Sequence, residues 1–147
     1  MNDGLKMVRI LLVEDNPDDV DIARRALKKT LPAHELTVKR DGQEAVDYLI
    51  GDGGLDGGPP PDLILLDLNL PKVNGIEVLQ RIKQDHKASR IPVIMLTASE
   101  RDEDIAQSYK LGSNTYISKP VQYADFLHAI EVIAEYWLSL AKLPKAV

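Results

Sequence analysis

The sequence predicts an α/β domain in which a five-stranded parallel sheet is wound with helices on both faces, a doubly wound fold. Five short aliphatic runs alternate with segments in which apolar residues recur at helical spacing. The runs are almost continuously aliphatic, which is typical of strands buried on both faces. No repeat or linker divides the 147 residues, so we expect one domain over residues 1–147, with its core at about 7–138.

The first strand and the first helix have the clearest boundaries. The aliphatic run VRILLV at 8–13 predicts a buried strand, and it stops at an acidic pair. Asn16 then supplies a helix N-cap, and Pro17 suits the first helical position. Apolar residues continue at helical spacing, which predicts a helix over 17–30.

The next segment is less regular. It predicts a weak strand over 36–38 and, after a break at Asp41-Gly42, a short helix over 43–50. Residues 51–61, GDGGLDGGPPP, hold too much glycine and proline for a regular element, so we expect an inserted loop. The loop does not match a phosphate-binding loop, because prolines and a strand follow where that motif needs a lysine, a hydroxyl residue and a helix.

The second half continues the alternation of strands and helices. A capping-box pattern, Ser99-Glu-Arg-Asp102, predicts the start of one helix, and Gly112 predicts its end. The last helix carries one apolar stripe that includes Phe126 and Ile133. The other elements expected here are strands over 63–67, 92–97 and 115–118 and a helix over 76–85.

Composition excludes several classes of function. The formal net charge is −5, which disfavours DNA binding, for which a basic patch is expected. No apolar run is long enough to span a membrane, and the N-terminus lacks the features of a secretory signal, so we expect a cytoplasmic protein. Without cysteine or a plausible histidine pair, a zinc site is not expected.

Polar residues gather where four of the predicted strands end. Ligands of doubly wound sheets bind outside the carboxyl ends of the strands, so these side chains should meet at one rim. Three carboxylates around one ammonium group repel one another unless a pKa rises or a cation binds, and their hard oxygen atoms favour Mg²⁺. The four strand ends are Glu14-Asp15, Asp67, Thr97-Ala98 and Lys119-Pro120, and their polar side chains are three carboxylates, one hydroxyl group and one ammonium group.

A carboxylate beside Mg²⁺, a lysine and a hydroxyl group suits phosphoryl transfer. Asp67 would attack phosphorus, the metal and Lys119 would neutralise the equatorial oxygens, and Thr97 would donate a hydrogen bond to one of them. Each residue alone has an ordinary structural explanation, such as a helix start or a strand end. Their occurrence together at four strand ends favours a functional site.

The chain resembles response-regulator receiver domains over essentially its whole length. The resemblance implies a flavodoxin-like (βα)5 fold with strand order 2-1-3-4-5. It also implies that Asp67 accepts a phosphoryl group from a phosphohistidine of a sensor histidine kinase. The motifs that carry it are the pair Glu14-Asp15, the pattern D-x-x-x-P-x-x-x-G from Asp67 to Gly75, Thr97-Ala98 and Lys119-Pro120.

The resemblance also implies the roles of the site residues. Side chains of Asp15 and Asp67 and the main-chain carbonyl of Asn69 would hold Mg²⁺, with Glu14 acting mainly through water. The groups expected around the phosphoryl oxygens are the side chains of Thr97 and Lys119 and the backbone N–H groups of Asn69 and Ala98.

Two further expectations come with the family. The Lys119–Pro120 bond is expected to be cis, so that Lys119 reaches the site. Phosphorylation is expected to draw the Thr97 hydroxyl inward and to let Tyr116 fill the vacated space, although a static half-buried tyrosine is nearly as good an interpretation.

The chain ends about ten residues after the last helix, which predicts a stand-alone receiver that acts through protein contacts or phosphorelay. The extension at 139–147 and the end of the helix hold more apolar residues than packing needs. They either dock on the domain or, as we prefer, form an interface. This region and the inserted loop resemble regulators that partner phytochromes, which implies a homodimer and a phytochrome kinase. The expected interface residues are Trp137, Leu138, Leu140 and Leu143.

Two other classes of function compete with this interpretation. A phosphatase or hydrolase of the haloacid-dehalogenase type also places a nucleophilic Asp at a strand end. It needs a second Asp two residues later as general acid and base, where this chain has Asn69. An interaction module that works without phosphorylation would not need the intact set of site residues.

Overall fold

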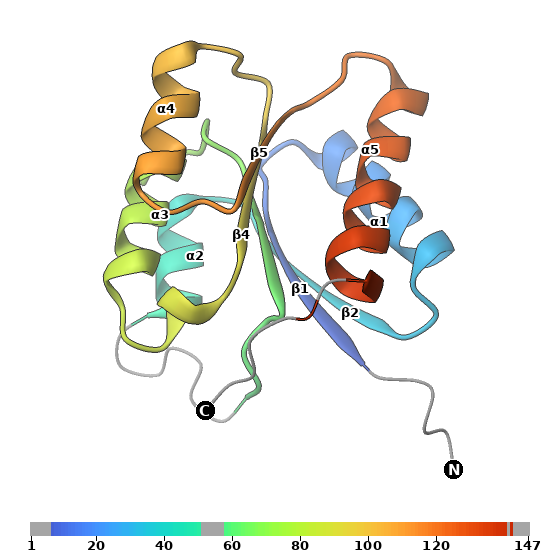
Figure 1. Ribbon diagram of the computed structural model, residues 1–147, viewed down its shortest axis with the longest axis horizontal. Helices are drawn as coiled ribbons and strands as arrows, with labels where there is room; N and C mark the ends of the chain where they lie inside the picture. Colours follow the sequence, from blue (N-terminus) through green and yellow to red (C-terminus); the bar gives the residue numbers. More distant parts are fainter. Residues whose placement is uncertain (1–6, 51–57, 141, 143–147) are drawn as a thin grey trace.

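Residues 7–50, 58–140 and 142 are described by the structure, a computed structural model (Figure 1). Five parallel strands form one sheet in the order β2-β1-β3-β4-β5, which confirms the predicted order. The strands are β1 (Val8–Val13), β2 (His34–Lys39), β3 (Leu63–Leu66), β4 (Val93–Thr97) and β5 (Thr115–Ser118).

Helices cover both faces of this sheet, as predicted. In Figure 1, α2, α3 and α4 lie on one side of the strands, and α1 and α5 lie on the other. A short turn of 3₁₀-helix, Ala88–Arg90, precedes β4, and a π-helical turn, Tyr136–Leu140, continues α5. The helices are α1 (Pro17–Thr30), α2 (Gly42–Leu49), α3 (Gly75–Gln84), α4 (Asp102–Lys110) and α5 (Tyr123–Glu135).

The aliphatic strands build two hydrophobic cores, one on each face. Successive side chains of a strand point to opposite faces, so a continuously apolar strand contributes to both cores. In β3, Ile64 and Leu66 join the core under α2 and α3, whereas Leu63 and Leu65 join the core under α1 and α5. All four are buried, as are all five residues of β4, so β3 is a fully enclosed support for the residue that follows it in the chain.

Most predicted boundaries agree with the structure to within one residue. The helix over 17–30 is confirmed, and the Asn16 side chain caps it by accepting hydrogen bonds from the backbone N–H groups of Asp18 (2.9 Å) and Asp19 (3.3 Å). The weak strand expected over 36–38 is longer, because all six residues of β2 pair with β1. Hydrogen bonding to β1 here outweighs the low strand propensity of the polar residues at the two ends of β2.

The prediction for the start of α4 is wrong. Ser99 does not cap the helix, which begins at Asp102 with no side-chain cap hydrogen bond. The Ser99 hydroxyl instead donates to the carboxylate of Asp104 (2.6 Å) and accepts from the backbone N–H of Arg101 (3.3 Å). The predicted end is correct, since Gly112 follows the helix with a φ of 105° that favours glycine.

Parts of two predictions lie outside the described residues. Of the loop expected over 51–61, only 58–61 is described, and it forms neither helix nor strand. Leu143 and the side chain of Leu140 are likewise outside the described set. Within the part of the chain that the structure describes, no helix is long and apolar enough to cross a membrane.

Candidate functional site

Asp67 is the first residue after β3, at the carboxyl end of a fully buried strand. Its side chain is nearly enclosed, and its backbone N–H donates to the carbonyl of Val13 in β1 (3.1 Å). The backbone N–H of Asn69 donates to its Oδ1 atom (3.2 Å). The carboxylate is therefore fixed by both the sheet and the turn that follows.

Gly75, at the start of α3, explains the last position of the D-x-x-x-P-x-x-x-G pattern. Its backbone N–H donates to the carbonyl of Leu68 (2.8 Å). A Cβ atom built on Gly75 would lie 2.1 Å from the carbonyl oxygen of Asp67, a distance that no packed side chain tolerates. Only glycine lets α3 begin this close to the backbone of Asp67.

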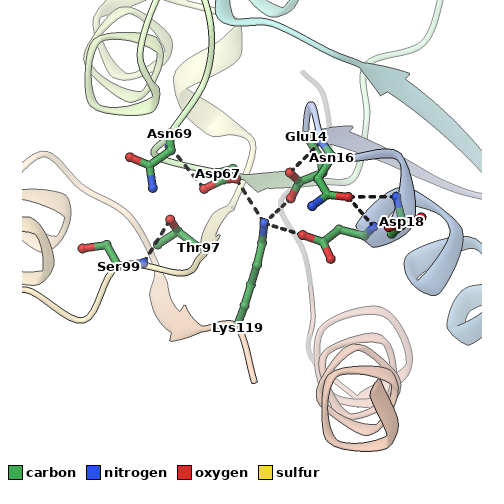
Figure 2. A network of polar contacts seen from close by, with 9 residues as sticks. Glu14, Asn16, Asp18, Asp67, Asn69, Thr97, Ser99 and Lys119 are labelled. Carbon is green, nitrogen blue, oxygen red and sulfur yellow. Dashed lines mark hydrogen bonds and ion pairs between the residues drawn. The ribbon is translucent and has the colours of Figure 1, made fainter. Parts of the chain in front are cut away.

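Lys119 reaches the same point from the end of β5. Its backbone N–H donates to the carbonyl of Thr97 (2.7 Å), which directs the chain toward the rim. Figure 2 shows its ammonium group between the carboxylates of Glu14 (2.5 Å) and Asp67 (3.1 Å). The predicted cis bond is wrong: no described peptide bond is cis, and the strand pairing already brings Lys119 to the site.

Asp19 is a site residue that the sequence prediction missed. Its Oδ2 atom lies 2.9 Å from the ammonium group of Lys119, although Asp19 belongs to the first turn of α1. Acidic residues are common in a first helical turn, so its sequence position suggested nothing more. The signal that could have identified Asp19 is its position about one helical turn after the acidic pair that follows β1.

Three carboxylates form a cluster that suits a divalent cation. Oxygen atoms of Glu14, Asp15 and Asp67 all lie within 4.8 Å of one another. Glu14 and Asp67 are buried, whereas Asp15 is exposed and leaves the cluster open to solvent. Hard oxygen donors in an open site fit Mg²⁺ or Mn²⁺, and the structure brings together all three carboxylates of the predicted metal set.

Burial makes the charges of this cluster costly. It raises the pKa of Glu14 to about 7, and the negative charge of Asp67 adds to the effect, while the hydrogen bond from Lys119 opposes it. Burial alone would lower the pKa of Lys119. Its hydrogen bond to Glu14 and the charges of Asp67 and Glu14 outweigh burial and raise that pKa. The lysine is thus firmly charged, and a bound cation would relieve the remaining repulsion.

Thr97 ends β4 on the other side of Asp67. It is fully buried, and its hydroxyl oxygen accepts a long hydrogen bond from the backbone N–H of Ser99 (3.5 Å). Figure 2 shows Thr97 and Asn69 on the side of Asp67 away from Glu14. Asn69 and Ala98 are exposed at the rim, so their backbones border the open side of the site.

Tyr116 in β5 is half-buried and linked to the loop that follows Thr97. Its hydroxyl group donates to the carbonyl of Ser99 (3.0 Å), which also accepts from the Ser118 hydroxyl (3.3 Å). Burial raises the pKa of Tyr116. The loop after β4 is therefore tied to β5 through a single carbonyl group.

The end of α5 is only partly free. Trp137 and Leu138 are half-buried and pack against the core under α1 and α5, as the docking interpretation required. Sequence reasoning missed the more exposed apolar residues there, Val132 and Tyr136, each about half exposed. An open groove of about 630 Å³ runs between β5 and α5; it is lined by Asn114, Thr115, Ile117, Ala129, Val132, Ile133, Tyr136 and Trp137.

This fold and site define a class of protein. A parallel sheet in the order 2-1-3-4-5 presents an aspartate, an acidic pair, a threonine and a lysine at one rim, which is the arrangement of a phosphoacceptor receiver.

The chain belongs to the response regulator receiver domain family, whose model matches residues 10–131. It is 42% identical to the response regulator Rcp1 of Synechocystis sp. (strain ATCC 27184 / PCC 6803 / Kazusa) over 137 residues. The aligned region covers 93% of each of the two chains. The receiver prediction is confirmed over the hydrolase alternative.

Solved structures agree with this assignment. A crystal structure of the phosphorylated cyanobacterial phytochrome response regulator RcpA superposes with a TM-score of 0.91 at 44% identity, over 95% of this chain and all of that one. The Mn²⁺-bound form of Rcp1 gives a TM-score of 0.88 at 41% identity, over 94% of this chain and 99% of that one.

Proposed function

We propose that Asp67 is the phosphoacceptor of a two-component response regulator. A carboxylate oxygen of Asp67 forms a bond to phosphorus as the bond from phosphorus to the donor atom breaks, and the donor leaves with that electron pair. Water later attacks the same phosphorus, the bond from phosphorus to the Asp67 oxygen breaks, and inorganic phosphate leaves as Asp67 becomes a carboxylate again. The contact between Asp67 and the ammonium group of Lys119 (3.1 Å), inside an acidic cluster, is the observation that carries this proposal.

The remaining site residues divide between the cation and the phosphoryl group. Asp15, Asp67 and the Asn69 carbonyl would hold Mg²⁺, with Glu14 acting through water, and the ion would neutralise charge that develops on the phosphoryl oxygens. Thr97 and Lys119 would donate hydrogen bonds to those oxygens. The backbone N–H groups of Asn69 and Ala98 border the same space and would assist.

The phosphodonor is proposed to be a phosphohistidine on a sensor kinase of the phytochrome type. Two similar proteins support this: RcpA is described as a cyanobacterial phytochrome response regulator, and RtBRR, 40% identical, as a bacteriophytochrome response regulator. We expect the exchange to take place in the cytoplasm and the output to be a change in protein contacts rather than DNA binding.

We further propose a homodimer formed through the end of α5. The exposed residues Val132 and Tyr136 lie beside Trp137, whose ring meets that of Tyr136 edge to face at 5.5 Å. Tyr136→Ser should shift the dimer toward monomer in sedimentation, because it removes exposed apolar area without disturbing the core. Tyr123→Ser, at the other end of α5 and similarly exposed, should have little effect. Equal effects of the two changes would refute this interface.

Phosphoryl labelling tests the main proposal. Purified protein with Mg²⁺ and acetyl phosphate should gain the mass of one phosphoryl group, and Asp67→Asn should abolish the gain. Labelling of the Asp67→Asn variant to the level of the parent would show that another residue is the acceptor. A reconstituted phytochrome kinase should then transfer its phosphoryl group to the parent and not to the variant.

A further inference from the structure

The Lys119 ammonium group is shared among three carboxylates from three elements. Its partners are Glu14 at the end of β1 (2.5 Å), Asp19 in the first turn of α1 (2.9 Å) and Asp67 after β3 (3.1 Å). An ammonium group has three N–H donors, so these contacts use all of them. In this state Lys119 can donate to a phosphoryl oxygen on Asp67 only if one of the three contacts is released.

The Asp19 contact is the one that is most easily released. The Asp19 side chain is 20% exposed, against 3% for Glu14 and 7% for Asp67, so water can take the place of the ammonium group there. Glu14 also accepts a hydrogen bond from the backbone N–H of Asn16 (3.2 Å), which fixes its orientation. Asp67 is the residue that would carry the phosphoryl group, so Lys119 has to stay close to it. Among the described residues, Lys119 is the partner recorded for the Asp19 carboxylate.

We propose that Asp19 is a positioning residue that holds Lys119 in the unphosphorylated protein and releases it when a phosphoryl group arrives. The inference rests on the proposed role of Asp67. Separating Asp19 from Lys119 opposes phosphorylation, and the Asp19 carboxylate also repels an anionic donor. Since coupling between two equilibria is reciprocal, removal of the Asp19 charge must favour binding of a phosphoryl group or its analogue.

The chain offers a matched control in the adjacent residue. Asp18 lies in the same turn of α1, carries the same charge, and its backbone N–H also bonds to the Asn16 side chain. Among the described contacts, it makes none with Lys119. Asp18→Asn therefore reproduces the loss of one negative charge at the start of α1, and Asp19→Asn adds the loss of the contact.

The test is a titration with beryllofluoride in the presence of Mg²⁺, followed by amide NMR shifts. Asp19→Asn should lower the half-saturating concentration roughly threefold to fivefold, the range of a partly exposed ion pair. Asp18→Asn should leave it nearly unchanged, and Asp19→Glu should stay close to the parent. In acetyl phosphate labelling, Asp19→Asn should lower the half-saturating donor concentration.

Equal midpoints for the Asp19→Asn and Asp18→Asn variants would overturn the inference, because the effect would then come from charge alone. Thermal unfolding would show whether Asp19→Asn is folded, and Asp19→Ser provides a second variant. If the parent itself fails to bind beryllofluoride, and behaves like Asp67→Asn, the proposed function of Asp67 is wrong. If instead the parent binds beryllofluoride and the Asp19→Asn variant binds it equally well, only the proposed role of Asp19 is wrong.

Discussion

The central strand β3 and the edge strand β5 differ in packing although both end at the same site. All four residues of β3 are buried, whereas all four residues of β5 are half-buried. The helix before β5 is just as loosely held, since α4 buries a single described residue, the polar Ser108. Asp67 thus follows the fully buried centre of the sheet, whereas Lys119 and Tyr116 belong to an edge whose side chains are only half-buried.

The difference indicates where a phosphoryl group can act. A new charge on Asp67 meets a support that is too tightly packed to move, so the response should appear in elements with few buried contacts. The loop after β4 is joined to β5 by the Ser99 carbonyl, which lies two residues from Thr97. We expect α4 and β5 to be rearranged while β3 remains in place.

The largest expected effect is a loss of stability at the centre. Leu65→Ala in β3 removes a fully enclosed side chain and should lower the free energy of unfolding by about 2–5 kcal/mol. Ile117→Ala in β5 should cost only about 1–2 kcal/mol, since part of that side chain is already in water. Urea unfolding of both variants measures the difference, and equal losses would contradict the contrast between centre and edge.

A second prediction concerns the turn that supports Asp67. Gly75→Ala should destabilise the protein by about 1–3 kcal/mol and impair phosphoryl uptake, because its Cβ would push against the Asp67 carbonyl. Gly58→Ala is a suitable control, since nothing lies within 4 Å of a Cβ built there. Calorimetry and acetyl phosphate labelling follow the two effects, and a normal Gly75→Ala variant would refute the close approach.

A third prediction concerns the cation. Mg²⁺ at tenfold its Kd should raise the free energy of unfolding by about 1.4 kcal/mol, and Asp15→Asn should lose most of that gain. Asp18→Asn, outside the cluster, should keep it. The pKa of Glu14 is raised to about 7, so protons compete with the ion and the gain should shrink as pH falls below that value. Thermal unfolding in MgCl₂ and in EDTA measures the gain for each protein. If Asp15 is not a ligand, the Asp15→Asn variant will gain as much stability from Mg²⁺ as the parent.

The smallest expected effect is at the edge. Tyr116→Phe removes the hydrogen bond to the Ser99 carbonyl and should cost about 0.5–1.5 kcal/mol, as Ser118 still donates to the same oxygen. The Tyr116→Phe change should alter the response of the protein to phosphorylation more clearly than it alters the free energy of unfolding. In urea unfolding, a loss as large as that of Leu65→Ala would show that the edge is no looser than the centre.

The sequence predicted elements that carry local signals better than features that depend on tertiary contacts, for a physical reason. Continuous aliphatic runs and the Asn16-Pro17 cap are local signals, so β3 and α1 were placed within a residue. The start of α4 depends on whether Ser99 bonds to the helix or to Asp104, a choice made by tertiary contacts. The same holds for Asp19, whose role appears only when α1 and β5 are brought together.

The response to beryllofluoride tests the difference between centre and edge most directly. Amide spectra of the protein with Mg²⁺ should show large shifts at Thr97, at Tyr116 and along α4 and β5, small shifts in β3, and no shifts in the Asp67→Asn variant. Shifts restricted to the immediate neighbours of Asp67, or as large in β3 as in β5, would contradict a rigid centre that drives a loosely packed edge.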